Sequence, residues 1–210
     1  MSGNKLKARD ADATRARILK AAKAEFARLG YAGARVDEIA EKAMANKRMI
    51  YHYFGSKERL FQLVLEEAYL DIRGAEKELN LDELPAMQAL EKLVTFTWDY
   101  YLANPEFITL VNSANLHRAK HLKESTRLRT ASRSLIDLIE GLLDRGVKEG
   151  VFRRGVDPLQ LNITIAAIGY YYLTNRFNSS ILFERDYMTT DALDERLAFN
   201  IDTVMRIVKV

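Results

Sequence analysis

Residues 35–54 read RVDEIAEKAMANKRMIYHYF and contain two short helical patterns joined by a tight turn. The first pattern covers residues 36–43, and the second covers residues 47–54 after Asn46, a suitable N-cap. Met44 lies in the turn between them. This spacing predicts a helix-turn-helix, in which the first helix braces the second against the major groove of DNA. The positions expected to be buried are Val36, Ile39, Ala40, Ala45, Ile50 and Phe54.

The opposite face of the second helix carries two cations, three ring side chains and a methionine. These residues are Lys47, Arg48, Met49, Tyr51, His52 and Tyr53. Phosphates and base edges are suitable partners for such a face. Lys57 adds a cation and backbone amides at the start of the next helix, where a phosphate can bind. An alternative is that Tyr51 or Tyr53 belongs partly to the core and that only the cations touch DNA.

The charge distribution along the chain supports a polyanion-binding N-terminal part. Residues 1–57 carry 13 Lys and Arg against 6 Asp and Glu, a net charge of +7. Residues 58–210 carry 19 against 23, a net charge of −4. A basic segment on an otherwise acidic chain indicates a polyanion-binding module joined to a second module.

The remaining sequence is helical in pattern, without convincing strands or internal repeats, and predicts an all-α fold. We expect a helix from Asp12 or Thr14 to Gly30 and a fourth helix capped by Ser56. Further helices are expected over residues 84–103, 107–116, 125–149, 157–177 and 191–207. The expected organisation is a disordered basic tail over residues 1–11, a helix-turn-helix domain over 12–57, and a ligand-binding and dimerisation domain over 58–210.

Three motifs together resemble the signature of TetR-family repressors across residues 14–65. They are Gly30-Tyr31, V-x-x-I-A at 36–40, and YHYFGSKExL at 51–60. The resemblance implies a chain of nine or ten helices that dimerises through its last two long helices. It also implies a palindromic operator and release from DNA when a small molecule binds the C-terminal domain.

The motif also departs from the family pattern at two positions. The family usually has Gly where Met44 stands, and a left-handed conformation costs a non-Gly residue roughly 1 kcal/mol. The family favours Thr where Arg35 stands, so Asp37 or the loop must supply any cap. Carried over by position, the candidate base contacts are Lys47, Arg48, Met49 and His52, with Asn46 in the same DNA-binding set. The candidate phosphate contacts are Arg35, Tyr51, Tyr53 and Lys57.

The C-terminal part offers aromatic and amide side chains within apolar helices, a mixture from which small-molecule pockets are built. The candidate ligand-binding residues are Trp98, Tyr101, Phe107, Asn112, Asn115, His117, Tyr171, Tyr172 and Asn175. Most aromatic residues at helical spacing are simply core, so the asparagines are the better candidates. His117, His121 and Glu124 have a metal-ligand spacing, but the surrounding cations favour ordinary surface histidines. We expect no metal and no cofactor.

Helix 157–177 is apolar almost all round, which predicts burial by the core on one side and by a partner subunit on the other. The expected interface of the homodimer is formed by residues 157–177 and 191–208. The chain has no cysteine, no signal peptide and no apolar run suited to a membrane, a combination that fits the cytoplasm.

The leading interpretation is a ligand-responsive DNA-binding transcriptional repressor. A ligand-independent DNA-binding protein or an activator stays open as an alternative. A small α-helical enzyme is less supported, because the sequence offers no cysteine nucleophile, phosphate loop or convincing triad. We therefore expect no catalytic residues.

Overall fold

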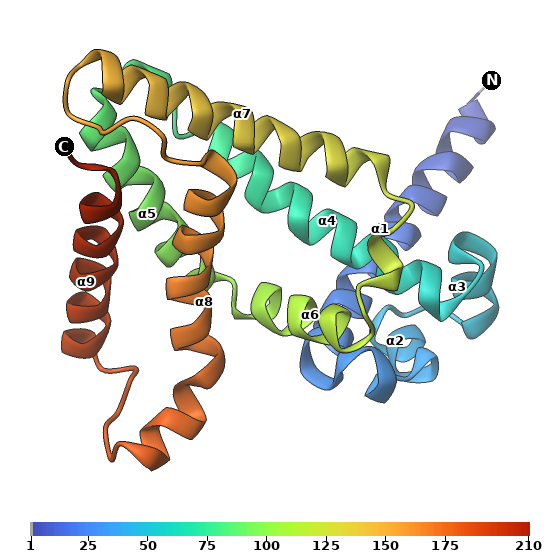
Figure 1. Ribbon diagram of the computed structural model, residues 1–210. Coiled ribbons are helices and arrows are strands. Elements are labelled where there is room, and N and C mark those ends of the chain that lie inside the picture. The colour runs from blue at the N-terminus through green and yellow to red at the C-terminus, as the bar shows by residue number, and fades with distance from the viewer. Residues whose placement is uncertain (1) are drawn as a thin grey trace. The chain divides into compact units, whose positions relative to one another are not determined.

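A computed structural model describes the backbone of residues 2–210 and the side chains of residues 10–210. The regular structure in this part is helical, as predicted (Figure 1). Its one β contact is an isolated bridge between Phe152 and Lys209. The chain divides into two compact units. Within the described residues, no helix carries an apolar stretch long enough to cross a bilayer.

Unit 1 comprises residues 1–70 and 105–128. It contains α1 (Ser2–Gly33), α2 (Val36–Lys42), α3 (Lys47–Phe54), the start of α4 (Lys57–Lys77), α6 (Pro105–Leu116) and the 3-10 turn η2 (Lys120–Leu122). The compact unit therefore extends beyond residue 57, where the sequence predicted the domain boundary. Leu60 and Phe61 of α4 are fully buried, and α6 packs along α1, so these segments share one core with the helix-turn-helix.

Unit 2 comprises residues 71–104 and 129–210. Its elements are η1 (Leu81–Glu83), α5 (Ala86–Ala103), most of α7 (Thr126–Lys148), α8 (Pro158–Leu182) and α9 (Thr190–Val208). Helices α5, α8 and α9 pack against one another (Figure 1). Ile139, Leu142 and Val204 are among the residues buried in their shared core.

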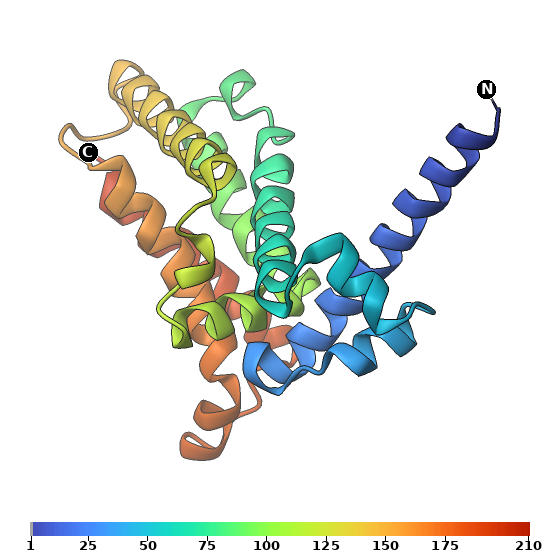
Figure 2. The ribbon, with the colours of Figure 1, turned by 90° about the vertical axis from the view of Figure 1, so that its right-hand side faces the viewer.

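Two helices, α1 and α8, extend furthest beyond their predicted ends. Residues 2–11, expected to be disordered, form the first turns of α1, which Figure 2 shows as a continuous helix reaching the N-terminal end. Extending an existing helix avoids the cost of nucleation, and this segment is rich in alanine, lysine and arginine, which favour helix. Towards its other end α1 is kinked at Gly30, whose φ of 67° interrupts the regular helix at the predicted residue before the last three residues of the element. Helix α8 runs to Leu182 rather than 177, because no glycine or proline interrupts residues 170–182.

The predicted N-caps after residue 40 are confirmed. The Asn46 side chain accepts a hydrogen bond from the Met49 amide at 2.9 Å, and Ser56 Oγ accepts one from the Arg59 amide at 3.0 Å. Asp157 likewise caps α8 through the Gln160 amide at 2.8 Å. Each cap satisfies an amide that the helix itself leaves unpaired.

A buried carboxylate joins α1 to α2. Glu25 is fully buried, and its oxygens lie 3.0 Å from the Arg28 guanidinium and 2.5 Å from the Lys42 ammonium. The hydrogen bond from Lys42 lowers the pKa of Glu25 despite the opposing effect of burial. Nearby, Arg17 Nε donates to the Ala43 carbonyl at 3.2 Å, which fixes the end of α2 on α1.

The turn between α2 and α3 has the hydrogen bonds of a Schellman motif. The Ala45 amide donates to the Ala40 carbonyl at 2.9 Å, and the Met44 amide donates to the Glu41 carbonyl at 3.0 Å. Met44 occupies the left-handed position, with a φ of 50°, and its side chain is 81% exposed. The turn therefore keeps a regular shape without glycine, at the cost of backbone strain.

Histidine 121 lies in an aromatic cluster inside unit 1. Its ring is 4.7 Å from the Tyr31 ring and 4.9 Å from the Phe61 ring, centroid to centroid. The side chain is buried, and neither ring nitrogen has a hydrogen-bond partner. The charged groups that face it are Glu58, whose Oε1 is 3.6 Å from Nδ1, and Lys120; the titratable His117 ring lies 6.1 Å away. Burial, with a smaller contribution from Lys120, lowers the pKa of His121.

Helix α8 has two apolar faces. The buried face consists of Leu161, Ile165, Gly169 and Leu173. A second row with the same four-residue spacing, which we call the exposed α8 stripe, consists of Leu159, Ile163, Ala167 and Tyr171. The large side chains of this stripe are 48–66% exposed. The prediction that the core covers only one side of this helix is confirmed.

Met44→Gly is expected to stabilise the protein by about 0.5–1 kcal/mol, because glycine adopts the left-handed conformation without a steric penalty. The measurement is the free energy of unfolding in urea. Met44→Ala, which shortens the side chain and keeps the Cβ, is the control and should change stability little. An equal gain from alanine would show that the methionine side chain, not the backbone, is unfavourable.

Acidification below about pH 6.5 is expected to destabilise the folded chain through His121. The pKa of His121 is lower in the folded state, so the unfolded state binds more protons as the pH falls from 6.5 towards the folded-state pKa. His121→Phe should therefore lose less stability than the parent between pH 7.5 and 5.5, measured by urea unfolding. His52→Phe, at an exposed position of α3, is the control; an unchanged pH profile for His121→Phe would contradict the expectation.

Candidate nucleic-acid interface

Helix α3 presents a polar and aromatic face because two large apolar side chains hold its other face in the core of unit 1. Ile50 is fully buried and Phe54 is 4% exposed. Of the six positions predicted to be buried, five are buried and Ala45 is half-buried. The outward side of the helix is therefore fixed before any DNA arrives.

The predicted contact residues divide into an exposed and a half-buried group. Lys47, Arg48, Tyr51 and His52 are exposed. Met49 and Tyr53 are half-buried, and the Tyr53 ring packs edge-on against the rings of its neighbours His52 and Phe54. Tyr53 thus has an apolar body within the domain, whereas Tyr51 is 44% exposed. Asn46 is exposed, and its side-chain oxygen serves the helix as its cap.

Lys47 is held by a carboxylate of the preceding helix. Its Nζ lies 2.9 Å from Asp37 Oδ1, and this contact raises the pKa of Lys47. Arg35 is close enough to oppose that effect slightly. Arg35 itself precedes α2 without capping it through its side chain, as expected from the missing threonine. Lys47 must leave or share Asp37 to reach DNA, whereas Arg48 has no carboxylate within ion-pair distance among residues 10–210.

Lys57 is turned back onto its own domain. Its ammonium lies 5.0 Å from the centre of the Tyr31 ring and 3.4 Å from the Ala32 carbonyl oxygen. Partial burial lowers its pKa. This arrangement joins the start of α4 to the loop after α1, and a phosphate would compete with a carbonyl for the same cation.

The candidate ligand-binding residues are split between the two units. Unit 2 holds Trp98, Tyr101, Tyr171, Tyr172 and Asn175, and unit 1 holds Phe107, Asn112, Asn115 and His117. In unit 2, Tyr171 and Tyr172 line a cavity of about 460 Å³. The buried Trp98 ring packs behind Tyr172 at 5.5 Å, centroid to centroid.

The remaining candidates have contacts within their own helices or cores. Asn115 and Asn175 each donate from Nδ2 to the carbonyl four residues earlier, at 3.1 and 3.0 Å. Phe107 is buried against Tyr69, and the Tyr101 ring lies 6.1 Å from the Tyr170 ring. Each Nδ2 group therefore has an acceptor within its own helix, so neither amide donor needs a ligand to satisfy it. Within the described side chains, no group of three or more metal-binding residues is arranged around a common point.

Several residues of the unit 2 cavity were absent from the sequence prediction. They are Ser179, Phe183, Arg185, Tyr187, Ala192, Glu195, Arg196 and Phe199. A signal that could have indicated those before residue 190 is the recurrence of aromatic and apolar residues among positions 177–188, beyond the predicted end of the helix.

Comparison with known proteins assigns both parts of the chain. Residues 18–64 match the model described as "Bacterial regulatory proteins, tetR family", and residues 85–204 match "Tetracyclin repressor-like, C-terminal domain". The chain is 38% identical over 201 residues to the HTH-type transcriptional repressor NicS of Pseudomonas putida, covering 96% of this chain and 95% of NicS. It is 45% identical over 104 residues to the HTH-type transcriptional repressor SCO4008 of Streptomyces coelicolor, about half of each chain.

A solved structure agrees with this assignment. The putative transcriptional regulator SCO4942 from Streptomyces coelicolor superposes with a TM-score of 0.69 at 28% identity, covering 93% of this chain and 98% of that one. The same assignment therefore follows from the recognition motif, from the all-α architecture and from both family matches. The chain belongs to the TetR family of ligand-responsive, DNA-binding transcriptional repressors.

Proposed function

We propose that this chain acts in the cytoplasm as a homodimeric repressor, which binds a palindromic operator through α3 and leaves it when a small molecule binds unit 2. The observation that carries the proposal is the outward face of α3. Arg48 and His52 project from a helix whose opposite side is locked by Ile50 and Phe54. A fixed helix whose guanidinium has no ion-pair partner among residues 10–210 suits base edges in the major groove.

The names of the relatives support repression rather than activation, since both NicS and SCO4008 are described as repressors. The exposed α8 stripe supports a dimer, because a contiguous apolar surface on a soluble chain marks an interaction site. A two-fold dimer would bring two copies of α3 to half-sites about one helical turn of DNA apart, or a multiple of it.

The deciding experiment is selection of bound DNA from a random pool. A palindromic consensus with regular half-site spacing is the expected result. Uniform affinity for all sequences would favour the alternative, a ligand-independent DNA-binding protein. Transcription from the selected operator in vitro would then distinguish repression from activation.

Replacing both Lys47 and Arg48 by alanine is expected to abolish binding to the selected operator. One base-contacting arginine contributes about 1–3 kcal/mol, and loss of a phosphate contact weakens binding further. The matched control is Lys148→Ala with Arg154→Ala, which removes two exposed charges from unit 2. Fluorescence anisotropy at fixed salt measures affinity, and circular dichroism checks helicity. Unchanged operator binding by the α3 variant would refute the assignment of this face.

Ile163→Glu, in the middle of the exposed α8 stripe, is expected to convert the dimer to monomers because it places a charge in an apolar interface. Sedimentation velocity measures the oligomeric state. Leu116→Glu makes the same kind of change at an 83% exposed leucine in unit 1 and should leave the dimer intact. A dimer of unchanged stability after Ile163→Glu would exclude the stripe from the interface.

A further inference from the structure

The cavity in unit 2 lies between the C-terminal half of α8, the segment 183–189 and α9. Its volume of about 460 Å³ is within the range of small-molecule pockets. Five of its lining side chains are aromatic: Tyr171, Tyr172, Phe183, Tyr187 and Phe199. A planar, largely apolar guest suits walls of this composition.

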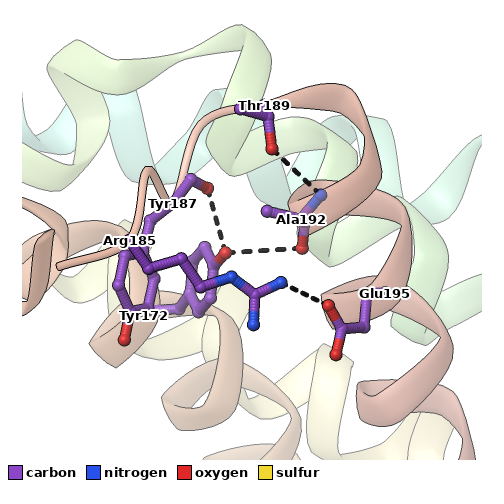
Figure 3. A network of polar contacts seen from close by, with 6 residues as sticks. All are labelled: Tyr172, Arg185, Tyr187, Thr189, Ala192 and Glu195. Atoms are coloured by element: carbon purple, nitrogen blue, oxygen red, sulfur yellow. Dashed lines mark hydrogen bonds and ion pairs between the residues drawn. The ribbon is translucent and has the colours of Figure 1, made fainter. Parts of the chain in front are cut away.

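The wall formed by Tyr172 is fixed by polar contacts (Figure 3). Its hydroxyl lies 2.9 Å from the Tyr187 carbonyl oxygen and 3.4 Å from the Ala192 carbonyl oxygen, so it joins α8 to both the connecting segment and α9. The Tyr172 and Tyr187 rings are 5.0 Å apart, centroid to centroid. The hydroxyl proton is therefore engaged in the protein, and the ring face is what remains for a guest.

Two of the three charged side chains of the cavity neutralise each other. The Arg185 guanidinium reaches past Tyr172 to form an ion pair with the Glu195 carboxylate (Figure 3). This pair connects the segment 183–189 to α9. The net charge of this pair is zero, so it does not require a charged group on the ligand.

Arg196 is the third charged side chain, and its charge is not neutralised. Among residues 10–210 no carboxylate lies within ion-pair distance of it. Its Nη2 donates to the Ile168 carbonyl at 2.9 Å, but its Nε is buried without a hydrogen-bond partner. The guanidinium carbon lies 5.3 Å from the centres of both the Tyr172 and Phe199 rings. The two rings stabilise the guanidinium through cation–π contacts, but they carry no net charge. An anion entering the cavity would therefore add a charge-assisted hydrogen bond that the described residues do not supply.

Together, these features lead us to propose that the cavity binds a small planar aromatic monocarboxylate, with its carboxylate on Arg196 and its ring between the aromatic walls. One positive charge without a carboxylate partner in the lining matches one negative charge on a guest, so the lining favours a monoanion over a neutral guest of the same shape. A guanidinium also pairs with a carboxylate through parallel hydrogen bonds. The proposal deepens the ligand response described above by naming the chemical class of the effector and its site.

The experiment is isothermal titration calorimetry of the full chain with benzoate and 2-naphthoate. Benzamide and 2-naphthamide are the uncharged probes of the same shape, and acetate is the anion without a ring. At least one aromatic carboxylate is expected to bind saturably, about 10-fold or more tightly than its amide, with acetate not binding. Failure of both aromatic carboxylates to bind, or equal affinity for acid and amide, would overturn the proposal.

The matched variants are Arg196→Met and Arg206→Met. Both lie on α9, but Arg206 is exposed and paired with Asp202 at 2.6 Å. Arg196→Met should lose at least about 10-fold in carboxylate affinity, and Arg206→Met should bind like the parent. Arg196→Lys, which keeps the charge, should retain the preference for acid over amide even if Arg196→Met unfolds. Loss of that preference in a folded Arg196→Lys would count against the proposal.

The link to DNA is measured separately. The bound carboxylate should lower the affinity for the selected operator, and this effect should be absent in Arg196→Met. If an operator is found but no aromatic carboxylate binds, the cavity proposal fails while the repressor proposal stands. If a carboxylate binds but no operator is found, the repressor proposal fails while the cavity proposal stands.

Discussion

The burial of one side of α3 is the constraint on which DNA recognition depends. An eight-residue helix is too short to be stable in water by itself, so α3 exists because Ile50 and Phe54 are removed from solvent by the rest of unit 1. The N-cap supplied by Asn46 adds to this but could not replace it. The same packing fixes the rotation of the helix, and hence which side chains can meet a groove.

That constraint extends beyond the two helices of the motif. The buried Glu25 and its two cations join α1 to α2, and the Tyr31 amide donates to Ser113 Oγ of α6 at 2.8 Å. The whole of α6 and the first part of α4 therefore belong to the same compact unit as the helix-turn-helix. A sequence-based boundary at residue 57 could not include them, because the contacts between α1 and α6 join residues about 80 positions apart.

The sequence predicted best where the signal is local. The N-caps at Asn46, Ser56 and Asp157, the positive φ at Gly30 and the strained Met44 each depend on a few neighbouring residues, and the structure has each of them as predicted. The cavity of unit 2 was only partly predicted, through Tyr171 and Tyr172. Arg196 could not be identified from sequence, because an arginine on an amphipathic helix is ordinarily a solvated charge. Its proposed role depends on which rings surround it and on the absence of a nearby carboxylate among the described side chains.

The two faces of α8 explain how one helix can serve both proposed activities of unit 2. Its buried face holds α8 on α5, where the Trp98 ring packs behind Tyr172. Its exposed stripe ends at Tyr171, which also lines the cavity. A guest that inserts beside Tyr171 and Tyr172 would therefore act at the edge of the proposed dimer interface. A ligand shifts an equilibrium only by its differential affinity for two states. Arg196 has no carboxylate partner among the described residues and would gain one from the proposed ligand. The arrangement of α8 and α9 that best fits the carboxylate would gain this ion pair, which would provide such a difference.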